Sequence, residues 1–145
     1  MSTFVYDGDC AFCTACARLI IRWIPTSARV VPWQFTDLGA LGLDRARCQE
    51  AVQWVPAGPD KVKAGPDKVK AGPDKVKAGP AAIAALLRSS DRGAWRAIGW
   101  ALDTRPALRP AGPIYRWVAR HRHQLPGGTA ACAMPPPAPK TDYAP

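Results

Sequence analysis

The stretch FVYDGDCAFCTAC, residues 4 to 16, decides how the rest of the chain is interpreted. Its apolar residues 4 to 6 favour a short buried β-strand. Asp7-Gly8-Asp9 favours a turn, in which Asp9 is a candidate N-cap for a following helix. Cysteines then recur every third residue at positions 10, 13 and 16. The stretch therefore predicts a strand-to-helix junction that carries two carboxyl groups and a cysteine pair.

The remaining residues predict an α/β layer built outward from this junction. Pro25 ends the first expected helix. Because proline donates no backbone hydrogen bond, Pro32 favours an edge position or a late start for the second strand. The expected strands are 4–6, 30–35, 51–55 and 75–77, and the expected helices are 11–24, 44–49, 81–87, 94–102 and 114–125. This order predicts one α/β domain over residues 1–125, with a sheet of about four strands, flanking helices and a C-terminal helical extension.

The last helical segment is interrupted by prolines. Prolines 106, 110 and 113 predict a bend or break ahead of residue 114. After them, Ile114, Trp117 and Val118 share one helical face with Leu125, and we expect this face to pack against the layer.

Residues 57 to 77 repeat the unit AGPDKVK three times without change. Glycine and proline in every unit exclude a coiled coil despite the period of seven, and a single valine per unit is too little apolar surface for a solenoid. We therefore expect a flexible basic loop inserted into a hairpin between the third and fourth strands. Residues 126–145 are rich in proline, and we expect them to form a disordered tail.

The composition favours a folded, basic protein. Hydrophobic residues make up 48% of the 145 residues, and the formal net charge is +9. No nucleic-acid recognition motif accompanies the charge, so we expect the arginines on solvated helix faces and no nucleic-acid partner. Only three residues precede Phe4, which leaves no room for a signal peptide, and no apolar run is long enough to span a membrane. We expect a cytoplasmic protein, in which five cysteines point to catalysis or metal binding.

Cys10-Ala11-Phe12-Cys13 is a CxxC motif at the start of the expected helix. A helix N-terminus carries a partial positive charge and unpaired N–H groups, both of which stabilise a thiolate. We therefore expect Cys10 to be an exposed nucleophile with a lowered pKa, and Cys13, one turn later, to resolve the mixed disulfide. Asp7 either accepts the proton of Cys13 during exchange or shapes the turn by capping backbone amides.

Residues 6 to 13, Tyr-Asp-Gly-Asp-Cys-Ala-Phe-Cys, resemble the signature Y-D-G-x-C-x-x-C of the DCC family of thiol-disulfide oxidoreductases. The resemblance covers most of the chain and continues through AVQWV at 51–55, AIAALL at 82–87, Trp95-Arg96, the residues 115–120 and the late cysteine Cys132. It implies a thioredoxin-like fold and maps the family's name residues onto Asp7, Cys10 and Cys13. Two features depart from the family and fold patterns. The repeats replace a short turn, and Gln49-Glu50 stands where thioredoxin-like enzymes usually have a cis-proline.

Metal binding is a second chemistry that the cysteines could support. The candidate ligands for zinc or an iron–sulfur cluster are Cys10, Cys13, Cys16, Cys48, Cys132, His121 and His123. Iron–sulfur runs usually continue with another cysteine close by, whereas the next cysteine after Cys16 lies 32 positions on. On a continuing helix, Cys16 should instead turn toward the core.

Phosphoryl transfer is a third chemistry. A strand that ends in D-x-D resembles the haloacid-dehalogenase phosphatases, with Asp7 as nucleophile and Asp9 as acid–base group. Such enzymes also need later lysine and acidic motifs to hold phosphate and magnesium. Asp91 and Asp103 are isolated in the sequence, and most lysines lie in the repeats.

We therefore expect a thioredoxin-like thiol-disulfide oxidoreductase with Cys10, Cys13 and Asp7 as its catalytic residues. Its partners would be thiols and disulfides of proteins or small molecules, and it would need no cofactor beyond its own dithiol. Cys132 is a possible internal disulfide partner for Cys10. The alternative is a metal- or partner-binding module whose cysteines are not turned over.

Deletion of residues 57–70, which removes two repeat units, should leave the fold intact. The remaining unit keeps a Pro-Asp turn signal and the strand residues 75–77. Loop closure costs only about 0.6 kcal/mol per doubling of loop length, so the melting temperature should stay within a few degrees of that of the full chain. Loss of soluble protein, or of a disulfide-reductase activity that the full chain has, would show that the repeats are needed.

Overall fold

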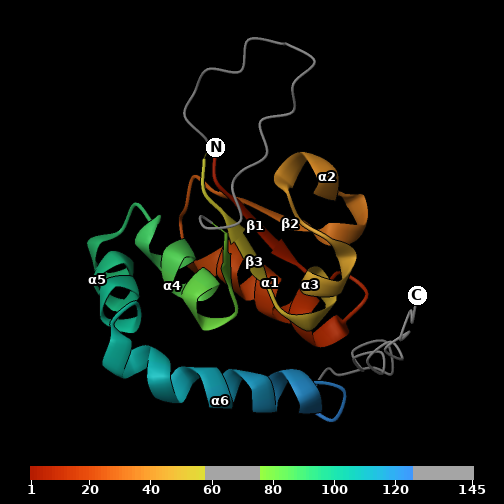
Figure 1. Cartoon of the computed structure of the whole chain (residues 1–145). Helices are drawn as coiled ribbons and strands as arrows, with labels where there is room; N and C mark the ends of the chain where they lie inside the picture. The colour runs from red at the N-terminus through yellow and green to blue at the C-terminus, as the bar shows by residue number, and fades with distance from the viewer. Residues whose placement is uncertain (58–75, 126–145) are drawn as a thin grey trace, which may run out of the picture.

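The computed structural model describes residues 1–57 and 76–125, which form one sheet with helices packed around it (Figure 1). Its strands are β1 (Thr3–Tyr6), β2 (Arg29–Pro32), β3 (Gln53–Val55) and β4 (Lys77–Ala78), in the sheet order β2-β1-β3-β4. Its α-helices are α1 (Ala11–Trp23), α2 (Leu38–Leu41), α3 (Arg45–Glu50), α4 (Pro80–Arg88), α5 (Gly93–Leu102) and α6 (Arg105–His121). β1 and β2 are parallel, whereas β3 runs antiparallel to both β1 and β4. The expected α/β class is confirmed, and the arrangement is consistent with a thioredoxin-like fold.

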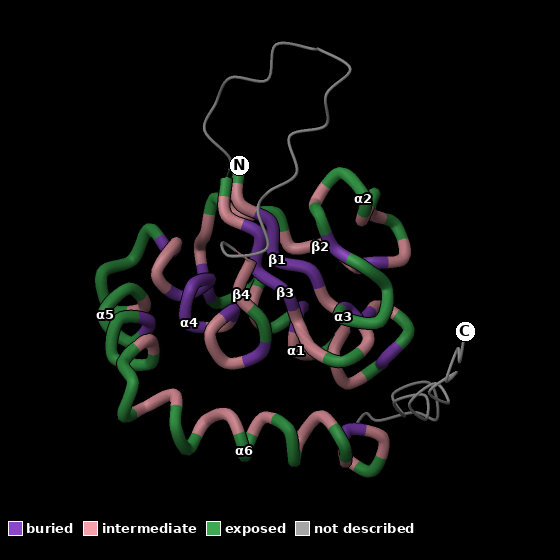
Figure 2. Tube along the Cα trace, viewed as in Figure 1, coloured by how far each residue is buried: buried purple, intermediate pink, exposed green. Residues whose placement is uncertain are grey.

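Alternation along β1 divides the core between the two faces of the sheet. Phe4 and Val5 point to opposite faces, because successive side chains of a strand alternate. On one face, Phe4 packs in a buried cluster with Trp54 of β3 and Leu86 of α4. On the other, Val5 packs in a cluster with Trp33, from the segment between β2 and α2. β1 is therefore buried on both sides, as Figure 2 shows, and it fixes the position of the turn that follows it.

The segment after β2 is shorter in strand and richer in helix than predicted. The strand expected over 30–35 lies on the edge of the sheet, as the proline indicated, but it ends at Pro32, and a 3-10 helix, Trp33–Phe35, follows. Asp37 and Asp44 cap α2 and α3, since each side chain accepts a hydrogen bond from the backbone N–H three residues later. The short helix expected in this segment is confirmed, and a second one precedes it.

The repeats separate the two strands of an antiparallel hairpin. β3 pairs with β4 through Gln53 and Trp54, which lie opposite Ala78 and Lys77. Residues 58–75, which hold most of the repeats, lie outside the described residues. So do residues 126–145, for which a disordered tail was predicted.

α5 packs closely on α4 at Gly99. A Cβ atom at this position would lie 2.7 Å from the backbone N of Arg88 and 2.8 Å from the carbonyl O of Ala84. Because those are backbone atoms that cannot move aside, the close approach of the two helices requires glycine. Near this contact, Asp103 pairs with Arg88 and accepts a hydrogen bond from Lys77 Nζ over 3.0 Å. Asp103, isolated in the sequence, therefore joins β4 and α4 to the end of α5.

α6 is one continuous helix, so the predicted break ahead of residue 114 is wrong. Pro106 lies at the helix start, where a missing N–H removes no helical hydrogen bond. Pro110 and Pro113 lie inside the helix and deprive the carbonyls of Pro106 and Arg109 of their donors. All four residues are exposed, so water can bond those carbonyls on the solvent side.

The face that α6 turns toward the sheet differs in part from the prediction, since Val118 lies inward as expected but Ile114 and Trp117 are largely exposed. Ile114 and Trp117 are 62% and 57% exposed. Tyr115 lies inward instead, and its hydroxyl accepts a hydrogen bond from the backbone N–H of Val52 over 3.1 Å. The inward stripe consists of Leu108, Ala111, Tyr115, Val118 and Arg122, alternately three and four residues apart. Neither this helix nor any other among the described residues is long and apolar enough to cross a membrane.

Candidate active site

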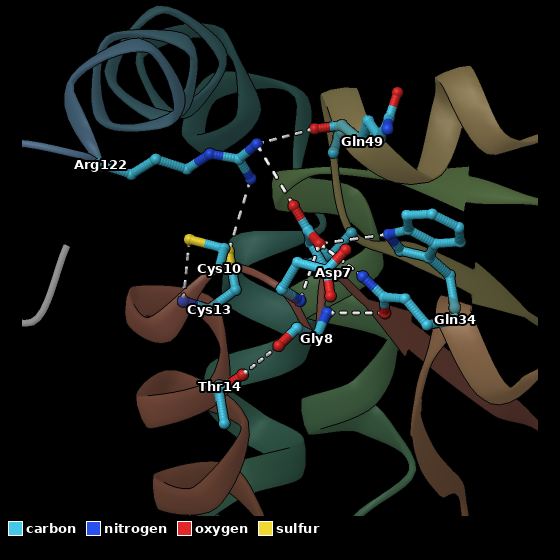
Figure 3. Close-up of polar contacts among 12 residues, drawn as sticks. Asp7, Gly8, Cys10, Cys13, Thr14, Gln34, Gln49 and Arg122 are labelled. Carbon is cyan, nitrogen blue, oxygen red and sulfur yellow. Dashed lines mark hydrogen bonds and ion pairs between the residues drawn. The ribbon is translucent and has the colours of Figure 1, made fainter. Parts of the chain in front are cut away.

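The candidate site lies where β1 ends and α1 begins (Figure 3). Cys10 is the N-cap of α1, and its Sγ accepts a hydrogen bond from the backbone N–H of Cys13 over 3.5 Å. The expectation that Asp9 caps the helix is therefore wrong. Asp9 is exposed, and its N–H donates to the carboxylate of Asp7 over 3.2 Å. The structure thus brings Cys10, Cys13 and Asp7 together at one strand-to-helix junction.

The cysteines of the described residues differ in their chemical state. Cys10 is disulfide-bonded and fully buried, so the expectation of an exposed sulfur is wrong for this form of the protein. Cys13 and Cys16 are half-buried free thiols on α1, and Cys48 is a buried free thiol on α3. Cys132 lies outside the described residues. The CxxC motif therefore holds one sulfur in a disulfide and the other as a thiol.

Asp7 is buried, and its carboxylate is surrounded by donors. Its Oδ1 accepts hydrogen bonds from Asp9 N–H at 3.2 Å, Trp33 Nε1 at 3.2 Å and Gln34 Nε2 at 3.0 Å. Its Oδ2 lies 3.6 Å from Arg122 Nη2. A buried carboxylate is costly unless it is paired and hydrogen-bonded, and these partners meet that requirement. Asp7 therefore shapes the turn, one of its two expected roles, and also binds two distant segments to it.

Gly8 allows the segment after β2 to pack against the same turn. A Cβ atom on Gly8 would lie 2.7 Å from Pro32 Cβ and 2.8 Å from Gln34 Oε1. Because glycine has no Cβ atom, Gln34 can approach the backbone, and the Gly8 N–H donates to Gln34 Oε1 over 3.0 Å. The Gly8 carbonyl accepts a hydrogen bond from the Thr14 hydroxyl over 3.2 Å. The glycine is required here by close approach, since its φ angle is not positive.

Arg122, just after α6, is the site residue that the sequence analysis missed. Its side chain is only 6% exposed, so the expectation of solvated arginines is wrong at this position. Figure 3 shows its guanidinium reaching across the junction to three groups. These are Asp7 Oδ2 at 3.6 Å, Cys13 Sγ at 3.5 Å and the carbonyl O of Gln49 at 3.0 Å. Gln49, which stands where a cis-proline was expected by analogy, therefore contacts the site through its backbone.

A sequence signal for Arg122 exists in the spacing of α6. The alternation of three and four residues that places Tyr115 and Val118 inward continues to position 122. Trp33 and Gln34 carry no comparable signal. Their contacts with Asp7 depend on the parallel pairing of β2 with β1, which the residues of the segment do not reveal.

Burial and the neighbouring charges shift the pKa of the Cys13 thiol in opposite directions. Burial raises the pKa of Cys13 above its ordinary value, and the charge of Asp7 adds to this rise. The charge of Arg122 and its hydrogen bond to Sγ lower the pKa, but the net shift is upward. Burial also raises the pKa of Cys16, and it raises that of Cys48 to about 11, with help from Asp44 and Asp7. Desolvation therefore outweighs the guanidinium, and Cys13 is held mainly as the protonated thiol.

An apolar cavity of about 470 Å³ adjoins the site. It lies against the sheet face that carries Phe4, and α1 and α6 contribute most of its wall. Cys13, Cys16 and Arg122 all line it. Cys16, which was expected to turn into the core, therefore opens on this cavity instead.

Within the described part of the chain, the predicted metal ligands do not form a metal-binding cluster. Among residues 1–57 and 76–125, no group of three or more His, Cys, Asp or Glu side chains could hold a metal ion. Cys48 packs in the core cluster of Val5, on the opposite sheet face from the cavity. His121 stacks on Trp117 with ring centroids 4.8 Å apart, and its Nδ1 lies 2.8 Å from the Trp117 carbonyl O.

Comparison with known proteins assigns the chain to a family. A family model described as DCC1-like thiol-disulfide oxidoreductase matches residues 4–128. No curated protein and no solved structure gave a match. The matched range contains β1 from Phe4 onward, the CxxC motif and Arg122, so it includes Asp7, Cys10, Cys13 and Arg122 of the site.

Substitution of Arg122 tests the buried contact with Asp7. Arg122→Gln leaves the Asp7 carboxylate buried without its charged partner, so the free energy of unfolding should fall by roughly 3–5 kcal/mol. The pKa of Cys13 should rise further, because a charge that lowers it is lost. Arg120→Gln, at an exposed position, should change the free energy of unfolding by less than about 0.5 kcal/mol. Urea unfolding and the pH dependence of Cys13 alkylation measure both effects. An unchanged alkylation profile in folded Arg122→Gln would count against the assigned contact.

Disulfide mapping tests the predicted link between Cys10 and Cys132. Cys13, Cys16 and Cys48 are free, and Arg122 fixes the chain at the site ten residues before Cys132. Ten residues can span up to about 33 Å, which is enough to return to Cys10. Digestion after blocking with N-ethylmaleimide, without reductant, should give a Cys10–Cys132 peptide that disappears on reduction. A Cys10–Cys13 peptide with Cys132 blocked would refute the link.

Proposed function

The chain belongs to the DCC1-like thiol-disulfide oxidoreductase family, and from this premise we propose that it catalyses thiol–disulfide exchange with Cys10 as nucleophile and Cys13 as resolving thiol. One observation carries the assignment of roles. Cys10 is disulfide-bonded, while the free thiol of Cys13 lies beside it on the first turn of α1. A mixed disulfide that awaits resolution needs the same arrangement, with one sulfur bonded and a second thiol next to it.

The proposed reaction is a pair of displacements at sulfur. The Cys10 thiolate attacks a substrate disulfide and forms a mixed disulfide, while the other substrate sulfur leaves as a thiolate and takes a proton from water. The Cys13 thiolate then attacks Cys10 Sγ, which forms a Cys10–Cys13 disulfide and releases the second substrate thiolate. The dithiol supplies the two electrons, and an external dithiol restores it. The reverse sequence oxidises a substrate dithiol.

Arg122 and Asp7 support the second displacement. Cys13 must lose its proton before it can attack, and its raised pKa opposes that loss. The Arg122 guanidinium, 3.5 Å from Cys13 Sγ, stabilises the thiolate when it forms. Asp7 acts as a positioning residue, since its Oδ2 holds the guanidinium against the thiol. It can also receive the proton that Cys13 releases, which is the other role expected of it.

The proposed substrates are thiols and disulfides of proteins or small molecules, and the proposed compartment is the cytoplasm. The free thiols of Cys13, Cys16 and Cys48 agree with a reducing compartment, and the disulfide of Cys10 agrees with it when that disulfide is the transient one of a catalytic cysteine. The described residues offer no specific observation in favour of the second candidate, a metal- or partner-binding module.

Reduction of insulin disulfides, with dithiothreitol as electron donor, tests the proposed roles. Cys10→Ser should abolish catalysed reduction, because the attacking sulfur is lost. Cys13→Ser should slow turnover and leave substrate attached to Cys10, as added mass that excess dithiothreitol removes. Cys48→Ala, which alters a cysteine of the opposite core cluster, should retain activity. Turnover by Cys10→Ser equal to that of the unaltered chain would refute the proposal.

A further inference from the structure

The cavity beside the cysteines has the size of a ligand site. Its volume of about 470 Å³ falls within the range of roughly 300–1,000 Å³ typical of small-molecule pockets. α6 crosses beside the sheet and α1 in Figure 1, and it is anchored at Tyr115 and Arg122. The α6 side chains that line the cavity are Leu108, Ala111, Ile114, Tyr115, Val118 and Ala119, and they leave the space beneath the helix open. The two anchors fix the end of α6 beside this space.

The chemistry of the lining restricts what can bind. Most of the wall consists of aliphatic and aromatic side chains from β1, α1, α4 and α6. The Tyr115 hydroxyl is bonded to a backbone N–H, and the Arg122 guanidinium is bonded to Asp7 and to Cys13 itself. Cys13 and Cys16 line the cavity from α1 as free thiols. A ligand in the cavity therefore meets hydrocarbon over most of its surface and two thiols on one wall.

We propose that this cavity binds the hydrocarbon part of a thiol or disulfide substrate and so holds its sulfur beside the CxxC pair. The inference rests on the proposed function and names its substrate class as sulfur compounds carried on an apolar chain or ring. Burial of such a chain is favourable by about 0.8 kcal/mol per CH₂ group. Charged thiols such as glutathione are disfavoured, because their carboxylates would lose water against a carbon wall while Arg122 is already paired with Asp7.

Two methanethiosulfonate reagents test this preference on the full chain. S-octyl and S-(2-sulfonatoethyl) methanethiosulfonate each transfer an alkylthio group to a thiolate, which forms a new disulfide and releases methanesulfinate. One reagent delivers an apolar octylthio group and the other a charged sulfonatoethylthio group. Each rate of modification is divided by that reagent's rate with free cysteine, which corrects for its intrinsic reactivity. On this scale, the octyl reagent should modify Cys13 or Cys16 at least about tenfold faster than the sulfonatoethyl reagent. Peptide mapping by mass spectrometry identifies the modified cysteine.

A matched pair of variants tests whether the preference for the octyl reagent depends on the cavity. Ala111→Phe puts a bulky side chain on the cavity wall and should remove most of the octyl preference. Gly112→Phe adds the same side chain one residue later, where a Cβ atom meets nothing within 4 Å, and should retain the preference. If Ala111→Phe folds poorly, the smaller Ala111→Leu provides the same comparison.

The outcomes separate this inference from the proposed function. No octyl preference in the unaltered chain, or a preference that Ala111→Phe and Gly112→Phe retain equally, would overturn the cavity assignment. If Cys10-dependent insulin reduction persists in that case, the proposed function stands without it. An octyl preference that depends on the cavity, in a chain without insulin reductase activity, would support the binding site and overturn the proposed function.

Discussion

The buried contact between Arg122 and Asp7 holds the site together. Asp7 belongs to the turn after β1, and Arg122 follows α6, so the pair joins two ends of the domain. Neither side chain is stable alone in this position, since an uncompensated buried charge costs several kcal/mol. Asp7 also receives Trp33 and Gln34, which ties the segment after β2 to the same carboxylate. Removal of this carboxylate would leave the turn after β1, the segment after β2 and the end of α6 without the group that all three contact.

The same contact influences the pKa of Cys13, the proposed resolving thiol. Desolvation favours the neutral thiol of Cys13, and the guanidinium, which favours the thiolate, compensates only in part. This balance suits a resolving cysteine better than an attacking one. In the proposed reaction, the raised pKa keeps Cys13 from acting as the first nucleophile, and the guanidinium stabilises its thiolate when that thiolate attacks Cys10. Asp7 opposes Arg122 here, because its negative charge raises the pKa of Cys13, which the positive charge of Arg122 lowers.

Local features were predictable from the sequence, and long-range contacts were not. The first strand, the helix that begins at the CxxC motif and the edge position of the second strand follow from signals within a few residues, whereas the end of that strand at Pro32 was not predicted. The N-cap was misplaced by one residue, because aspartate is a stronger cap candidate than cysteine by residue type. In the structure the cap is Cys10, and Asp9 contributes its backbone N–H to Asp7 instead. Arg122 escaped prediction because Ile114 and Trp117 were assigned to the packing face of the last helix, where they are in fact exposed. The helix turns Tyr115 inward instead, and Arg122 lies two turns further along the same face.

The cavity follows from how α6 is fastened. Tyr115 and Arg122 are seven residues apart, two turns along the same face, and each is bonded to the region around the β3 start, at Val52 and at Gln49. That face carries the small residues Ala111 and Ala119 among larger apolar ones, and the two polar anchors fix the end of the helix nearest the site. A helix fixed by these two hydrogen bonds can keep its position although the space beneath it is not filled by side chains. The contact that stabilises the site therefore also keeps open the apolar space into which Cys13 and Cys16 project.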